Sequence, residues 1–382
     1  MEKVKNDTRL RWIDYARGIA IILVVYRHVF EGLKNTQILK VKGVSMDHYL
    51  YLEQANIFFF SFRMPLFFIV SGVFIAASLK KRGLGALMEN KAKTILYPYF
   101  IWGIIQISIQ ILFSGFINSK KTAADFLYLL YSPREVEQFW YLYALFNVSI
   151  LYAFTKSRTK ITSTQQVALG LCFFLLSTLF SQWGVELWFI NDILHYYLFL
   201  ALGDSLAHYI LKGKLKAFFY SWQALALLLL PFAFSQYYFL MTNIDHRAQS
   251  PKYLYVEYYQ PFAFLLVSLT GCMFIITVSS LLDRYDAVKW LRKLGKHSLY
   301  IYVMHVIVFA AVRVILTRFL KVYNIPLLMI ACISAGVIIP VLLYQLASKI
   351  GLKFLFTLET ANKPELKQKA QTISKPQPTY GN

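Results

Sequence analysis

The chain has 382 residues, of which 58% are hydrophobic and only 15% are charged. A soluble domain carries about a quarter charged residues, so this composition excludes an ordinary soluble protein and indicates a protein built to lie in lipid. The formal net charge of +21 would suggest nucleic-acid binding in a soluble protein. In a membrane protein it is typical of basic loops beside anionic lipid, so we expect membrane lipid and no nucleic acid as a partner.

Runs of about 20 mostly apolar residues, the length that crosses a bilayer as a helix, recur ten times along the chain. We therefore predict an all-α fold, a polytopic membrane bundle of about ten transmembrane helices. The expected spans are residues 12–30, 56–79, 95–116, 139–155, 166–183, 189–210, 218–240, 260–282, 298–317 and 326–347.

The charges between these spans predict their orientation. With the N-terminus inside, the cytoplasmic segments hold 26 Lys and Arg residues and the outer loops hold 10. Basic loops stay in the cytoplasm, so both termini are expected there. Residues 1–347 form one expected membrane domain. Residues 348–382 form a basic cytoplasmic tail, and from Thr360 this tail has the polar, Lys- and Pro-rich composition of a disordered end.

The first span carries ionisable side chains that a membrane helix normally avoids. Arg17 and His28 are eleven residues apart, which is about three turns, so both lie on one face and about 16 Å apart along the axis. Asp14 lies three residues before Arg17 and can pair with it. Charged groups inside a span indicate a functional site by default. Arg27 faces about 100° away from His28 and is expected to extend to the outer interface.

Two interpretations of this polar face remain open. In the first, Arg17 binds an anionic group that enters from the cytoplasm, and His28 acts as a general base for a hydroxyl proton. In the second, Asp14 and Arg17 form a structural ion pair, and His28 is an interfacial histidine near the helix end.

The second and third spans add further candidates. In the run Phe62-Arg-Met-Pro-Leu-Phe-Phe-Ile-Val-Ser-Gly72, the proline kinks a membrane helix, and Ser71 with its glycine permits close helix approach. Arg63 lies at a depth similar to that of His28. Lys91 and Lys93, ahead of the third span, could attract phosphate groups as point charges or simply mark the cytoplasmic side.

Later spans carry polar residues at or near their ends. Glu137 lies just before the fourth span, and Trp140 near its start either anchors that span at the interface or stacks on a sugar ring. His305 lies about two turns inside the ninth span, where it could face His28 or pack. The weaker candidates are Asp192, His195 and Asp204 in the sixth span. No cysteine has a partner at metal spacing, so no metal is expected.

Taken in order, these motifs resemble the acyltransferase family 3 membrane proteins over about residues 9–347, in a style closest to the branch related to fucose 4-O-acetylases. The first-helix pattern is Trp-Ile-Asp-x-x-Arg-Gly-Ile-Ala, with His28 eleven residues after the arginine. The later patterns are Met-Pro-Leu-Phe-Phe-x-x-Ser-Gly, a Trp-x-Leu-x-x-Leu run, and Leu-Gly-x-x-Ser-Leu-x-x-Tyr-x-x-His at the end. Arg63 stands where relatives often have His, and Lys91 and Thr94 stand where an Arg-x-x-Arg pattern is common.

The resemblance implies a multi-pass O-acyltransferase of the bacterial inner membrane. It would move an acyl group, usually acetyl, from cytoplasmic acetyl-CoA to a hydroxyl of a cell-surface carbohydrate, either a surface glycan or a lipid-linked sugar. The implied site residues are His28 as catalytic base with Arg17 and Asp14; Arg17, Lys91, Lys93 and Ser71 at the acyl-CoA donor; and Arg63, Trp140, Glu137 and His305 on the acceptor side. The alternative is a transporter or flippase for a glycan or lipid-linked precursor, because intramembrane charges also mark transport pathways.

Overall fold

The computed structural model of the protein describes residues 10–116, 121–211, 214–249 and 256–358. The described residues are 86% helical and contain no strand. This confirms the predicted all-α bundle. Residues 359–382, which make up most of the predicted tail, lie outside the described residues.

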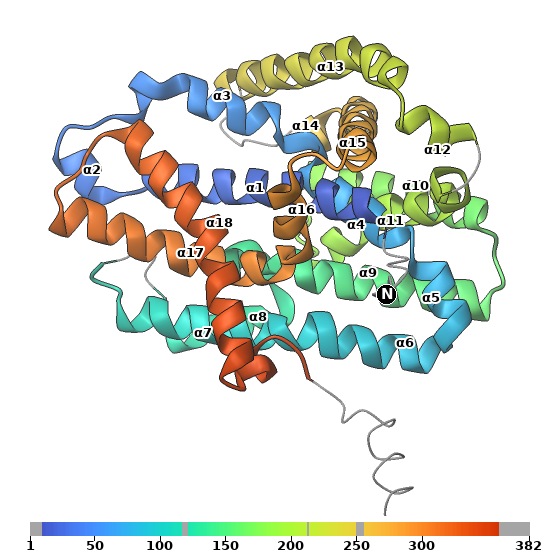
Figure 1. Ribbon diagram of the computed structural model, residues 1–382, viewed down its shortest axis with the longest axis horizontal. Helices are drawn as coiled ribbons and strands as arrows, with labels where there is room; N and C mark the ends of the chain where they lie inside the picture. Colours follow the sequence, from blue (N-terminus) through green and yellow to red (C-terminus); the bar gives the residue numbers. More distant parts are fainter. Residues whose placement is uncertain (1–9, 117–120, 212–213, 250–255, 359–382) are drawn as a thin grey trace, which may run out of the picture.

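Each of the ten expected spans overlaps one of the longer helices of the described residues, although the span 56–79 covers parts of three helices (Figure 1). These helices are α1 (Arg11–Lys34), α4 (Phe60–Gly72), α7 (Tyr97–Leu112), α9 (Trp140–Arg158), α10 (Ser163–Gln182), α11 (Phe189–Leu211), α13 (Trp222–Gln249), α15 (Pro261–Arg284), α17 (Ser298–Val314) and α18 (Ile325–Lys349).

Short helices and turns join the long ones. The short helices are α2 (Gln37–Val41), α3 (Leu50–Phe58), α5 (Ile75–Arg82), α6 (Leu84–Lys91), α8 (Tyr128–Tyr131), α12 (Lys214–Phe219), α14 (Val256–Tyr259) and α16 (Lys289–Lys296). The 3₁₀ turns are η1 (Met46–Tyr49), η3 (Ala123–Leu127), η4 (Pro133–Phe139) and η6 (Leu352–Leu355), and the π-helical turns are η2 (Ala92–Leu96) and η5 (Ile315–Phe319).

Seven helical stretches of the described chain are long and apolar enough to cross a bilayer, so the protein is an integral membrane protein. They are Met46–Arg82, Leu84–Leu112, Ser163–Gln182, Trp222–Asp245, Pro261–Arg284, Ser298–Phe319 and Ile325–Lys349. The other three long helices, α1, α9 and α11, are not among these seven stretches. The number of ten spans and the orientation of the termini remain predictions.

The basic segment 80–94, expected to be a cytoplasmic loop, is mostly helical. Helix α5 continues to Arg82, and α6, η2 and α7 then run without a break from Leu84 to Leu112. Ala, Leu, Met, Glu and Lys dominate the sequence of α6, and all are strong helix formers. Only Gly83, at φ 76°, interrupts the chain, in a conformation that glycine adopts readily.

Helix α1 runs through the middle of the bundle (Figure 1). It contacts α4, α15, α16, α17 and α18, whereas α13 and α7 lie on opposite outer sides of the molecule. Its apolar residues from Trp12 to Leu33 belong to the hydrophobic core. The polar side chains of α1 are therefore directed at other helices rather than at lipid.

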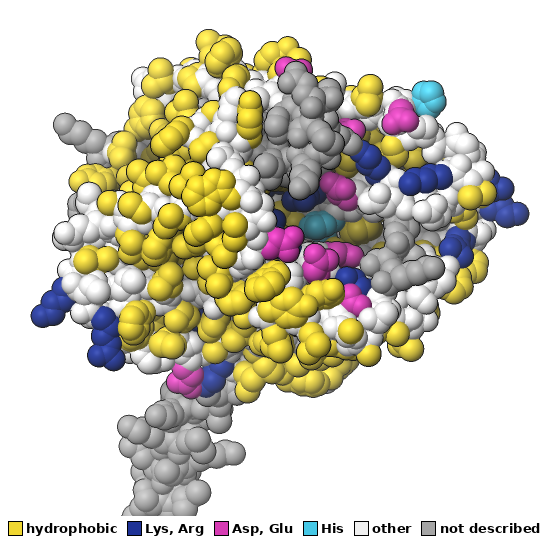
Figure 2. All heavy atoms as spheres, turned by 180° about the vertical axis from the view of Figure 1, so that it is seen from behind, with side chains coloured by type: hydrophobic (Ala, Val, Ile, Leu, Met, Phe, Trp, Pro, Cys, Tyr) yellow, Lys and Arg dark blue, Asp and Glu magenta, His cyan; other side chains and the backbone are white. Residues whose placement is uncertain are grey.

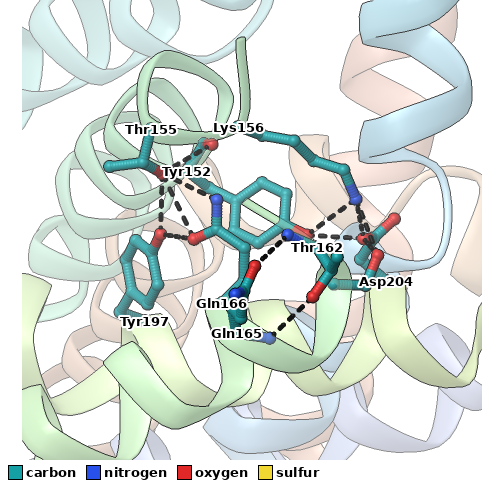
Figure 3. A network of polar contacts seen from close by, with 9 residues as sticks. Tyr152, Thr155, Lys156, Thr162, Gln165, Gln166, Tyr197 and Asp204 are labelled. Atoms are coloured by element: carbon teal, nitrogen blue, oxygen red, sulfur yellow. Dashed lines mark hydrogen bonds and ion pairs between the residues drawn. The ribbon is translucent and has the colours of Figure 1, made fainter. Parts of the chain in front are cut away.

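A polar network joins α9, α10 and α11 (Figure 3). One carboxylate oxygen of Asp204 accepts hydrogen bonds from Tyr152 Oη (2.5 Å), Lys156 Nζ (2.5 Å) and Ser163 Oγ (2.7 Å). Buried charges need such partners, so Asp204, a weak site candidate by sequence, connects three helices.

Helices α4 and α11 approach so closely that only glycine fits at their crossing. A Cβ atom on Gly203 would lie 2.1 Å from the carbonyl oxygen of Ile69, and one on Gly72 would lie 2.0 Å from that of Leu200. Small residues permit this kind of backbone contact between membrane helices.

The Gly203→Ala substitution is therefore expected to destabilise the protein, because α11 must move away from α4. Gly85 in α6 has open space around its Cβ position. Gly85→Ala is the matched control and should stabilise its helix by about 0.5–1 kcal/mol, the usual helix preference for alanine. Thermal unfolding of the detergent-solubilised variants measures both effects. A Gly203→Ala midpoint equal to or above the wild-type value would contradict the predicted close contact.

Candidate functional site

Residues near the C-terminal half of α1 line a cleft of about 600 Å³, which we call the histidine cleft. Figure 2 shows a hollow with histidine, acidic and basic side chains in a face that is otherwise largely apolar. The cleft is lined by Arg27, His28, Glu31, Gly32, Asn35, Gln37, Lys40, Gln110, Arg134, Glu137, Trp140, Val306, Phe309, Ala310 and Arg313.

A smaller chamber of about 130 Å³ shares Arg27, His28, Arg134 and Trp140 with the histidine cleft. We call it the side chamber. Its other lining residues are Val24, Phe60, Ser61, Arg63, Met64, Pro65, Tyr196, Glu257, Tyr258, Phe264 and Tyr302. His28 thus lies where the two cavities meet.

A third cleft, of about 180 Å³, lies nearer the start of α1 and is called the arginine cleft. It is lined by Arg17, Phe67, Ser71, Lys91, Ile95, Tyr141, Leu142, Leu145, Ser298, Leu299 and Tyr302. Arg17, Ser71 and Lys91 were expected to share a site on sequence grounds, and the structure brings all three together. They come from α1, α4 and α6.

Lys93 and Asp14 do not line any of these three cavities. Lys93 forms an ion pair with Glu89 one helical turn away. Asp14 is only 1% exposed, and its backbone lies against α16, where a Cβ on Gly295 would come within 1.6 Å of the Asp14 carbonyl oxygen.

His28 faces a second histidine. The ring centroids of His28 and His305 are 5.2 Å apart, with 56° between the ring planes. His305 Nδ1 lies 3.1 Å and 2.8 Å from the carbonyl oxygens of Ile301 and Tyr302. A carbonyl only accepts, so we assign the proton of His305 to Nδ1. Nε2 is then an acceptor.

Two arginines lie beside His28. Arg63 is 2% exposed, and its Nη1 donates to the Leu23 carbonyl oxygen (3.2 Å) and to Asn56 Oδ1 (3.0 Å). Arg27, expected to extend to the outer interface, instead lines both the histidine cleft and the side chamber. Because α1 is surrounded by other helices, a position 100° away from His28 still faces protein.

Glu137 lines the histidine cleft from η4, where its backbone has φ 55°. Its carboxylate accepts hydrogen bonds from Gln110 Nε2 (3.0 Å) and Gln106 Nε2 (3.3 Å). Non-glycine residues with positive φ are uncommon. The turn therefore carries local strain, and two amides hold its carboxylate toward the cleft.

Trp140 also lines this cleft, but Arg134 covers one face of its ring. The Arg134 guanidinium carbon lies 4.4 Å from the ring centroid of Trp140. The same guanidinium donates to Asp192 Oδ1 at 2.5 and 2.8 Å. Asp192 therefore positions Arg134, and Trp140 is only 9% exposed.

Sequence reasoning missed Arg134, Glu257 and Tyr302. Arg134 and Glu257 lie in connecting segments, far in sequence from His28. The residues around each of them are ordinary for a loop and form no motif that would mark a site. Tyr302 lies inside the quoted motif that ends at His305. It is three positions before that histidine, so the two side chains lie on the same face of the helix. That spacing is the one signal that could have pointed to Tyr302.

Tyr302 lines both the side chamber and the arginine cleft. Its hydroxyl donates to the backbone oxygen of Gln138, and its ring centroid lies 5.2 Å from that of Tyr141. The side chains of His28 and Arg17 therefore reach neighbouring cavities that meet at a wall of tyrosine.

The arrangement is that of a membrane-embedded enzyme with a histidine site and a separate cationic site. Within the described residues no group of three or more His, Cys, Asp or Glu could hold a metal ion. Residues 10–345 match the family model described as an acyltransferase domain, so the protein is a membrane acyltransferase. The chain belongs to acyltransferase family 3, as its motifs predicted. No curated protein and no solved structure matches it, and the fucose 4-O-acetylase-like branch remains a prediction.

Glu257, in the connection between α13 and α15, gives the side chamber a carboxyl group with a shifted pKa. It is 4% exposed, and burial raises its pKa to about 7, although Arg134 and Arg27 oppose the shift. The folded chain therefore holds this proton more tightly than the unfolded chain does, so stability should fall as pH rises from about 4.5 to about 7.

The Glu257→Gln substitution should remove that part of the pH dependence. At pH 8 the variant is expected to be more stable than the wild type, by up to about 3 kcal/mol for a shift of this size. Thermal unfolding at several pH values measures the difference, with Glu186→Gln, at an exposed loop position, as the control. Parallel wild-type and Glu257→Gln curves between pH 5 and pH 8 would contradict the shifted pKa.

Proposed function

We propose that the protein transfers an acyl group, acetyl in the first instance, from cytoplasmic acyl-CoA to a hydroxyl of a cell-surface carbohydrate. His28 takes the proton of the acceptor hydroxyl as general base. The acceptor oxygen then attacks the thioester carbonyl, the C–S bond breaks, and the coenzyme A sulfur leaves and takes up a proton. The ring of His305 lies next to that of His28, so it is placed to share the positive charge that His28 gains with the proton.

The observation that carries this proposal is the meeting of two unlike cavities at Tyr302. The arginine cleft offers Arg17 and Lys91 to an anionic ligand, and Ser71 as a hydrogen-bonding group. The histidine cleft and the side chamber offer the catalytic base. An acyl-CoA bound in the first cavity would need to extend only its acyl end past Tyr302 to reach His28.

The polar lining of the histidine cleft supports a carbohydrate acceptor. Carboxylates and amides such as Glu31, Asn35, Gln37 and Glu137 line a space of about 600 Å³. These groups can donate to and accept from sugar hydroxyls. Arg63 and Glu257 extend the polar lining to the side chamber.

Membership of an acyltransferase family favours this function over the alternative of a transporter or flippase. The donor separates the two: an acyltransferase of the proposed kind binds acyl-CoA and consumes it, whereas a transporter moves a glycan unchanged. The orientation supports a donor from the cytoplasm, because the predicted topology puts Arg17 toward the inside and His28 toward the outside.

Replacing His28 by alanine should lower kcat for acyl transfer by about 10²- to 10⁴-fold, the usual contribution of a general base. The reaction is followed in proteoliposomes by release of coenzyme A and by the mass of the glycan product. His48→Ala, at an exposed position in η1, is the control and should retain activity. A properly folded His28→Ala protein with undiminished kcat would eliminate the assignment.

Lys91 and Lys93 provide a matched pair of charges for the donor site. Lys91→Gln removes a cation that lines the arginine cleft, and it should raise KM for acyl-CoA about tenfold, the equivalent of about 1.4 kcal/mol. Lys93→Gln removes a cation two residues away that is paired with Glu89, and it should leave KM near the wild-type value. Initial rates over a range of acyl-CoA concentrations distinguish them. Equal effects of the two variants would mean that general positive charge, not the cleft, attracts the donor.

A further inference from the structure

An apolar groove of about 380 Å³ lies between α7 and α17, two helices that pack side by side (Figure 1). Ten of its twelve lining residues are apolar, among them Phe113, Phe116 and Phe319. Ile315 and Phe319 of η5, the π-helical turn that follows α17, also line the groove. π-Helical turns occur frequently at functional sites.

The groove adjoins the histidine cleft. Gln110, Val306 and Ala310 line both cavities. A single layer of side chains therefore separates the apolar groove from the histidine cleft. Gln110 is 5% exposed, and its amide nitrogen donates to Glu137. Its Oε1 has no hydrogen-bond partner within the described part of the chain, so the wall offers a buried acceptor to a ligand hydroxyl.

Cations lie around this pair of cavities. Arg318 is exposed, and its guanidinium carbon lies 4.9 Å from the ring centroid of Phe116, which lines the groove, so this cation lies beside the groove. Its Nη2 donates to the Gly115 carbonyl oxygen at 2.9 Å. Lys40 is exposed in the histidine cleft. An apolar slot with positive charge beside it suits a hydrocarbon chain that carries an anionic group.

We infer that the groove holds the hydrocarbon chain of a membrane-anchored acceptor, a saccharide linked to an isoprenoid chain through phosphate. The chain lies between α7 and α17, the phosphate lies near Arg318, and the sugar extends over the shared wall into the histidine cleft. This inference rests on the proposed function and names the form in which its acceptor reaches His28.

Photo-crosslinking tests the binding step without any turnover. Purified protein in nanodiscs is irradiated with a diazirine derivative of farnesyl-phosphate-linked hexose, and labelled peptides are identified by mass spectrometry. Labels are expected on α7 and α17. Unlabelled farnesyl-phosphate-linked hexose should compete, whereas free hexose and excess phosphatidylglycerol should not. Absence of groove labelling, or equal competition by phosphatidylglycerol, would overturn the inference.

Ala311 provides the variant, because it lines the groove but not the histidine cleft. Ala311→Phe fills the groove and should reduce groove labelling about tenfold, whereas Ala226→Phe, at an exposed position in α13, should not. With an accepted sugar, Ala311→Phe should raise KM for the lipid-linked form and leave KM for a soluble glycoside unchanged. Equal changes for both forms would refute a chain-binding groove.

The outcome can be separated from that of the proposed chemistry. His28→Ala should still be labelled in the groove, because the histidine is not part of it. Specific labelling without acyl transfer by the wild type would support the lipid site and refute the acyltransferase mechanism. If instead the groove is not labelled and Ala311→Phe leaves the rate of acyl transfer unchanged, the acyltransferase mechanism is supported and the lipid site is refuted.

Discussion

The position of α1 at the centre of the bundle is the constraint on which the rest of the structure depends. An ionisable side chain surrounded by helices in lipid is costly unless it is paired or reaches a water-filled cavity. Helix α1 carries Arg17, Arg27 and His28, and each of them lines at least one cavity. The surrounding helices pack tightly around most apolar residues of α1 and around Asp14, and they leave space at Arg17, Arg27 and His28. The site follows from this uneven packing.

A wall of tyrosine separates the side chamber from the arginine cleft. Tyr141 and Tyr302 pack against each other between the arginine cleft and the side chamber. An enzyme that carries an activated acyl group beside a base must keep water from that group until the acceptor is bound. The rings of Tyr141 and Tyr302, with the Tyr302 hydroxyl held by the Gln138 backbone, form that barrier, which in the proposed reaction lies between the donor and the base.

The parts of the site that sequence could predict are those on one regular element. Arg17 and His28 were placed on a common face because helical geometry relates residues eleven apart. The resemblance to a family then joined Ser71 and Lys91 to Arg17, and the structure brings these three together. Arg134 and Glu257 could not be found in the same way, because they reach the side chamber from connections between helices. Their position depends on how distant helices pack, as the pairing of Arg134 with Asp192 shows.

The same reasoning explains where the predicted boundaries differ from the structure. Positive charge marked residues 80–94 as a loop, but charge reports the side of the membrane and not the backbone conformation. Lysine is itself a good helix former, so α6 leads directly into α7 with Lys91 on it. That continuity matters to the site. A lysine on a mobile loop would attract a donor only by its charge, whereas a lysine on a rigid helix that ends in the arginine cleft presents that charge at a fixed place beside Arg17.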